Sequence, residues 1–150
     1  MALEIGGGNG VHPMMVAALT DLPVVDTDAM GRAYPEAQMT SFAVAELQCY
    51  PMALADIRDN EMIISKAASW RWMERISRKV CAEIGSIAAT CKAPRSGREV
   101  IDHAILYTTT KAIDLGCAVM VARKEHRDPV AAIVKRCNGV RLFKGKVVDV

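Results

Sequence analysis

The sequence of 150 residues has few aromatic residues and no excess of charge of one sign. Phe, Trp and Tyr together make up 5% of the chain, which leaves little material for the platforms on which nucleic-acid bases stack. The chain has 19 Lys and Arg residues against 17 Asp and Glu, so its formal net charge is +2. Proteins that bind nucleic acid or anionic membranes carry a stronger basic footprint. We therefore expect neither nucleic acid nor a membrane as a partner.

Long apolar runs and a secretory signal are also missing from the sequence. No stretch approaches the roughly 18 apolar residues that a membrane helix needs, and the start lacks a basic segment followed by an apolar one. The five cysteines are odd in number and none form a C-x-x-C pair, which argues against a disulfide framework and a structural zinc site. We expect a soluble cytoplasmic protein whose cysteines are small buried hydrophobes.

The composition that is present indicates a globular protein. Hydrophobic residues make up 51% and charged residues 24%, and the length suggests a single domain over residues 1–150. The first 30 residues predict a βαβ unit with parallel strands. Its expected strand, glycine loop, helix and second strand fall at residues 3–5, 6–10, 14–19 and 22–25.

The rest of the chain predicts a β-rich segment followed by helices. Residues 39–67 have strand-like composition, including a strand within 41–47 and a hairpin that turns at Asp59 and Asn60. Helical spacing and capping residues then predict four helices. They are expected from Ser69 to about residue 84, from Ser96 to about residue 106, from 111 to 126, and from Asp128 to about residue 137. Residues 140–150 read as a strand with a glycine interruption. The fold class is α/β, with a layered mixed β-sheet and flanking helices.

An unusually dense group of charges follows the apolar residues 22–25. Asp26, Asp28 and Glu36 lie within eleven residues of one another, together with Arg32. Two neighbouring carboxylates raise the pKa of one of them, so they can act as a general acid and base, or share a metal ion. The planar guanidinium of Arg32 suits a carboxylate or a ring carbonyl. The alternative interpretation is an N-cap and a surface ion pair.

The glycine run near the N-terminus is the second candidate. Gly6, Gly7, Gly8 and Asn9 precede an expected helix, where backbone N–H groups can approach an anion or a carbonyl oxygen. The run matches neither the P-loop nor the full dinucleotide fingerprint, so a phosphate- or nucleotide-binding protein is a weaker alternative. A tight turn with close packing is the structural alternative. A divalent metal is a possible cofactor, but the sequence shows no complete set of ligands for one.

These two segments resemble a known family. The runs 4–10, 22–26 and 28–36, with Gln38 and Met39 after them, are similar to the S-methyl-thiohydantoin desulfurase-like family. The closing helix at Asp128 and the run 142–150 resemble its pattern too. The resemblance spans nearly the whole chain.

The resemblance implies an α/β fold with a mixed sheet, and chemistry on hydantoin-like or thiohydantoin-like rings by hydrolysis or removal of sulfur. The partner would be a small cyclic imide. Because family members are longer at both ends, it also implies that this chain corresponds to an internal section, and that residues 140–150 begin a following β-rich domain. A non-catalytic binding or assembly module is the alternative, either as a homo-oligomer or beside a hydantoinase-type subunit. Under the enzymatic hypothesis, Asp26, Asp28 and Glu36 are the catalytic candidates, and the glycine run and Arg32 bind the substrate.

Overall fold

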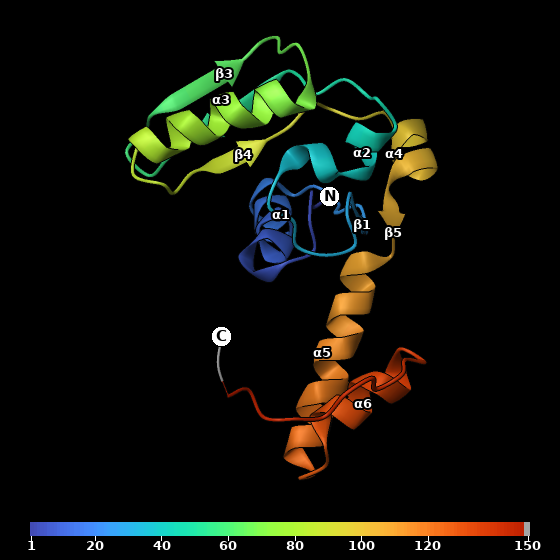
Figure 1. Cartoon of the computed structure of the whole chain (residues 1–150). Coiled ribbons are helices and arrows are strands. Elements are labelled where there is room, and N and C mark those ends of the chain that lie inside the picture. The colour runs from blue at the N-terminus through green and yellow to red at the C-terminus, as the bar shows by residue number, and fades with distance from the viewer. Residues whose placement is uncertain (149–150) are drawn as a thin grey trace. The chain divides into compact units, whose positions relative to one another are not determined.

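The computed structural model describes residues 1–148 and confirms the α/β class (Figure 1). Contacts divide the chain into two compact units, Met1–Thr108 and Thr109–Val150. The first unit holds two small antiparallel sheets and four α-helices, and the second is helical. The expectation of a single domain, with a β-rich domain starting at residue 140, stays a prediction.

Helix α1 (Gly7–Thr20) begins inside the glycine run, so the expected glycine loop is shorter than predicted. Gly7 has a φ of 50°, a left-handed conformation that glycine adopts at little cost. Pro13 lies inside the helix. The helix ends at Asp21, whose left-handed conformation lets its N–H bond to the Ala17 carbonyl.

The predicted βαβ unit is wrong, because neither of its strands forms within residues 1–30. Residues 3–5 and 22–25 are irregular. The strand in this region is β1 (Thr27–Asp28), which pairs antiparallel with β5 (Ile105–Leu106). Residues 22–25 are exposed, so their apolar character reflected no buried strand.

The predicted hairpin is confirmed. Strands β2 (Met52–Ala55) and β3 (Glu61–Ile64) pair antiparallel, and β4 (Ala89–Cys91) adds to the other edge of β2. The Asp56 carboxylate holds the connecting turn by accepting hydrogen bonds from the backbone N–H groups of Arg58 and Asn60. The turn is therefore longer than the two residues expected.

A short helix, α2 (Ser41–Val44), stands where a strand was predicted within residues 41–47, and the 3₁₀ turn η1 (Ala37–Met39) precedes it. The buried Thr40 hydroxyl donates to the Ala37 carbonyl and accepts from the Ala43 N–H. This N-cap favours a helix over the strand that the partial alternation of the sequence suggested.

Helix α3 (Trp70–Glu83) contributes Trp70 and Met73 to the core of the first unit. Ser69 caps it as predicted, by accepting from the Trp72 N–H. Met73 is fully buried and Trp70 is 8% exposed. The pair packs with Phe42, Met52 and other apolar side chains in one cluster. Figure 1 shows α3 lying beside strands β3 and β4 of the three-stranded sheet.

The remaining helices lie close to their predicted positions. Helix α4 (Gly97–His103) begins with the predicted capping box, formed by Ser96 and Glu99. Helix α5 (Thr108–Lys124) starts three residues earlier than expected, and α6 (Pro129–Arg136) has Asp128 as its N-cap. Residues 140–148 form no strand, and residues 149–150 of that predicted strand lie outside the described residues.

The cysteine interpretation is partly wrong. All five cysteines are free thiols, but Cys91, Cys117 and Cys137 are exposed, whereas Cys49 is buried.

Among residues 1–148, no helix has both the length and the apolar character needed to cross a membrane.

Met73→Ala tests the core of the first unit. The substitution removes a fully buried side chain, so we expect it to lower the free energy of unfolding by about 2–5 kcal/mol. Met15→Ala on α1 is the matched control, since Met15 is 55% exposed and its loss costs about 0.5 kcal/mol or less. Urea unfolding measures both, and equal effects would contradict the assigned core.

Candidate functional site

The side chain of Glu4 joins the glycine run to the acidic loop at residues 26–36. One carboxylate oxygen, Oε2, accepts a hydrogen bond from the Tyr34 backbone N–H at 2.8 Å. The other, Oε1, accepts from the side-chain amide of Asn9. The Leu3 carbonyl also accepts from the Ala29 N–H at 3.0 Å. The two segments singled out from the sequence therefore lie together.

Gly6 allows the closest approach between these segments. A Cβ atom built on Gly6 would lie 2.8 Å from the Cβ of Ala33 and 3.2 Å from its Cα. Contacts under 3.0 Å essentially never occur for real Cβ atoms, and the second atom is backbone, so the loop would have to move. Gly6 is thus required by packing against the acidic loop, which is one role that the sequence analysis left open.

The first turn of α1 faces this junction without a capping side chain. Gly6 is its N-cap residue and offers no side chain, and the first turn contains no acidic residue. Gly7 and Gly8 are exposed, so their backbone N–H groups can reach a ligand. The N-terminus of a helix favours negative charge, through these N–H groups and through the helix dipole. The imidazole of His12 lies close to Gly8, since a Cβ there would be 3.7 Å from its ring.

Asp26 and Asp28 sit in different environments, although Asp26 directly precedes strand β1 and Asp28 is its last residue. Asp28 is fully buried, and its Oδ2 accepts from the N–H groups of Met30 (3.0 Å) and Gly31 (2.7 Å). Its Oδ1 is buried and has no hydrogen-bond partner within the described residues. Asp26 is half-buried, and its backbone carbonyl accepts from the Tyr107 N–H. Asp28 thus holds the shape of the loop and keeps one carboxylate oxygen uncommitted.

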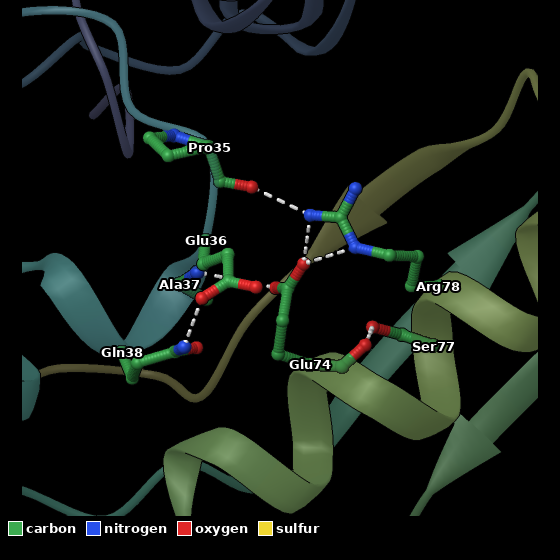
Figure 2. Close-up of polar contacts among 7 residues, drawn as sticks. All are labelled: Pro35, Glu36, Ala37, Gln38, Glu74, Ser77 and Arg78. Carbon is green, nitrogen blue, oxygen red and sulfur yellow. Dashed lines mark hydrogen bonds and ion pairs between the residues drawn. The ribbon is translucent and has the colours of Figure 1, made fainter.

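Arg32 and Glu36 lie in the second half of the loop. Arg32 is exposed, and its guanidinium donates to the neighbouring Ala33 carbonyl at 3.1 Å. Glu36 is half-buried and begins the turn η1, and its carboxylate accepts from the side-chain amide of Gln38 (Figure 2). Arg32 is therefore available to a ligand, while Glu36 is committed to a local contact.

An ion pair on α3 fixes the far end of the loop. Figure 2 shows Glu74 and Arg78 reaching from α3 to the backbone next to Glu36. Glu74 Oε2 accepts from the Ala37 N–H at 3.2 Å, and Oε1 accepts from Nε of Arg78 at 3.1 Å. The Arg78 Nη2 group also donates to the Pro35 carbonyl at 2.5 Å. The acidic loop is thus held by Glu4 on one side and by Glu74 with Arg78 on the other.

Tyr34 lies among the carboxylates that hold the loop. Burial raises the pKa of the Tyr34 phenol well above its usual range, and the negative charges of Glu4, Glu74 and Asp28 raise that pKa further. Tyr34 therefore remains protonated under all ordinary conditions. A neutral phenol beside several carboxylates is a hydrogen-bond donor, not a base.

Sequence reasoning missed the residues that position the loop. Glu4 and Tyr34 fall within the runs that carry the family resemblance, and Glu74 and Arg78 fall within the helix predicted from Ser69, but no role was predicted for them. The spacing of four between Glu74 and Arg78 indicates a helix surface pair, but nothing in it points to residue 37. Such contacts depend on tertiary structure, so no local sequence pattern predicts them.

No metal-binding group is evident in the part of the chain that the structure describes. Across residues 1–148, no three side chains of the His, Cys, Asp or Glu type come together as potential ligands. Asp26 and Asp28 thus gain no third ligand of this type from the described residues.

The raised pKa of Tyr34 predicts a stability change at alkaline pH. The folded protein holds the phenol proton more tightly than the unfolded chain, whose tyrosine pKa is about 10. The contribution is fully present below about pH 10 and is lost as pH rises above it, because only the unfolded chain then releases the proton. We expect the free energy of unfolding to fall more steeply above pH 10 in the wild type than in Tyr34→Phe.

Urea unfolding at a series of alkaline pH values measures this slope. Tyr107→Phe is the control, because the Tyr107 side chain is 71% exposed and should leave the wild-type slope unchanged. A wild-type slope equal to that of Tyr34→Phe would contradict the assigned environment of Tyr34.

Comparison with solved structures supports the fold. A crystal structure of a protein from Chromobacterium violaceum superimposes with a TM-score of 0.69 at 21% sequence identity. The match covers 80% of this chain and 34% of the other, so the chain spans about a third of that protein. At this identity the likeness establishes the fold alone. A search of curated proteins gives no match.

Family models account for almost the whole sequence. The S-Me-THD-like N-terminal domain matches residues 1–66, and the S-Me-THD-like C-terminal domain matches residues 68–150. The first match contains both the glycine run and the acidic loop, and the second contains α3 with its Glu74–Arg78 pair. On the strength of these two matches, the chain belongs to the S-Me-THD-like family.

Proposed function

We propose that the chain supplies the ring-binding part of a hydrolase or desulfurase that acts on a hydantoin-like or thiohydantoin-like cyclic imide. The observation that carries this proposal is the junction between the start of α1 and the acidic loop, which Glu4 and Gly6 hold together. Family membership supports the class of ring.

The start of α1 suits the charge that the reaction develops. When water attacks a ring carbonyl, or the ring carbon that bears sulfur, negative charge appears on the adjacent oxygen or nitrogen. The exposed N–H groups of Gly7 and Gly8 would stabilise that charge, because they are fixed at a positive helix end before the reaction begins. Gly6 and Asn9 would hold this turn against the loop.

Asp26 and Asp28, next to and within strand β1, would have different roles. Asp26 is the more accessible and would take a proton from the attacking water as general base. Asp28 would keep the loop in shape through its bonds to Met30 and Gly31, because its carboxylate is fully buried.

Arg32 and Glu36 differ in how available their side chains are to a substrate. Arg32 is exposed and would orient a carbonyl or a carboxylate of the substrate. Glu36, first considered as an acid, is bonded to Gln38, so an acid role would require it to leave that contact.

A binding or assembly module beside a hydantoinase-type subunit is the second candidate. Helix α1 favours it by exposing several large apolar side chains, namely Val11, Met15, Val16 and Leu19, which are 46–85% exposed. Exposed apolar side chains gathered on one element are typical of protein–protein contacts. A ring compound that binds without being converted would support this candidate over the enzyme.

Gly6→Ala tests the junction directly. A ligand that binds only the native state raises the unfolding temperature, so a scan against hydantoins and S-alkylated thiohydantoins should identify a ring that stabilises the wild type. We expect Gly6→Ala to abolish that rise, because the added Cβ separates the start of α1 from Ala33. Gly97→Ala is the matched control, since a Cβ there meets no atom within 4 Å.

Arg32→Ala is a second variant that should leave folding intact, because Arg32 is exposed. It should reduce the ligand-induced rise without altering the melt of the free protein. If a cooperatively folding wild type responds to none of the rings, or if both site variants respond like Gly97→Ala, the proposed site is wrong.

A further inference from the structure

A concave site lies between α3 and the three-stranded sheet, within the first unit. It is an open pocket of about 290 Å³. One wall is apolar and consists of Leu54, Cys81 and Ala82. The hydroxyl-bearing residues Ser77, Ser86 and Thr90 also line it. A cavity of this size, with mixed apolar and polar walls, suits a small organic molecule.

Three charged side chains face this pocket, and two of them are already satisfied. Glu74 uses both carboxylate oxygens, one for the Ala37 N–H and one for Arg78. Arg78 in turn bonds to Glu74 and to the Pro35 carbonyl (Figure 2). Lys92 is the third charged residue of the pocket, and it takes no part in these contacts.

Lys92 is the cation of this pocket that forms no ion pair with any residue of 1–148. It is half-buried. Taking an ammonium out of water without a hydrogen-bonded partner is costly. Burial accordingly lowers the pKa of Lys92, although the charges of Glu74, Cys91 and Glu4 act in the opposite direction. An anion bound in the pocket would supply the missing partner.

The surrounding charges narrow the type of anion. Arg78 is occupied, so a single ammonium is left to meet the ligand, and Glu74 lies in the same wall. A dianionic phosphate would be repelled by Glu74 and would find one cation instead of several. A monoanionic carboxylate needs only one ammonium and a few hydroxyl donors. The apolar wall favours a ligand with a hydrocarbon or aromatic body.

We propose that this pocket binds a small organic carboxylate, whose charged end pairs with the Lys92 ammonium and whose apolar body packs against Leu54, Cys81 and Ala82. Hydroxyl groups of Ser86 and Thr90 lie in the same pocket as further donors. The site is separate from the glycine run, and its existence does not depend on the proposed ring chemistry.

Paired probes test the role of the charge. Benzoate and benzamide have nearly the same shape, but only benzoate carries the negative charge. We expect benzoate to bind the full chain more tightly in an NMR titration, with amide shifts centred on residues 54, 86 and 90. Lys92→Met should weaken benzoate about tenfold or more, the size expected for a bond to a charged group, and leave benzamide unchanged.

Two further variants complete the design. Lys79→Met removes an exposed lysine of α3 that does not line the pocket, and it should bind benzoate like the wild type. Ala82→Leu places a larger side chain in the apolar wall and so narrows the pocket. It should weaken the binding of both benzoate and benzamide while leaving Lys92 in place. Equal affinity for the two probes, benzoate affinity that survives Lys92→Met, or shifts centred away from this pocket would each overturn the proposal. An effect of Lys92→Met no larger than that of Lys79→Met would also overturn it.

Discussion

The arrangement of the candidate site depends on one carboxylate, that of Glu4. Its two oxygens bind donors from different segments, the Asn9 side chain at the start of α1 and the Tyr34 backbone in the acidic loop. Hydrogen bonds to a charged acceptor contribute about 1.5–3 kcal/mol each, more than neutral ones. Gly6 makes the contact possible, because any larger residue would meet Ala33. The positions of Asp26, Asp28 and Arg32 relative to the N–H groups of α1 follow from this connection.

The sequence predicted those elements of the fold whose determinants are local. The capping residues Ser69, Ser96 and Asp128 each start a helix where expected, since a side-chain cap acts within three residues of itself. The βαβ unit was wrong because residues 22–25 have strand composition but no strand beside them. β1 pairs instead with β5, almost 80 residues later, and that pairing leaves no local trace.

The two segments of the candidate site were predicted from the sequence, but the contacts that hold them in place were not. The glycine run and the acidic loop were both recognised, because dense glycine and dense opposed charge are visible in composition. That they meet depends on Glu4, and that the loop is fixed from α3 depends on Glu74 and Arg78. These contacts span 30 to 43 positions of sequence, so they could not be read from spacing. The burial of Asp28 likewise could not be distinguished from an exposed, reactive carboxylate.

Hydrogen exchange at the Tyr34 backbone amide tests the central claim most directly. In the wild type this amide should exchange slowly, because it donates to Glu4 Oε2 at 2.8 Å. Glu4→Ala should accelerate its exchange by about tenfold or more, the factor that corresponds to one charged hydrogen bond. Exchange at Met73, in the core, should stay unchanged, and Glu61→Ala at an exposed position serves as the control. Equal Tyr34 exchange rates in the wild type and Glu4→Ala would contradict the account.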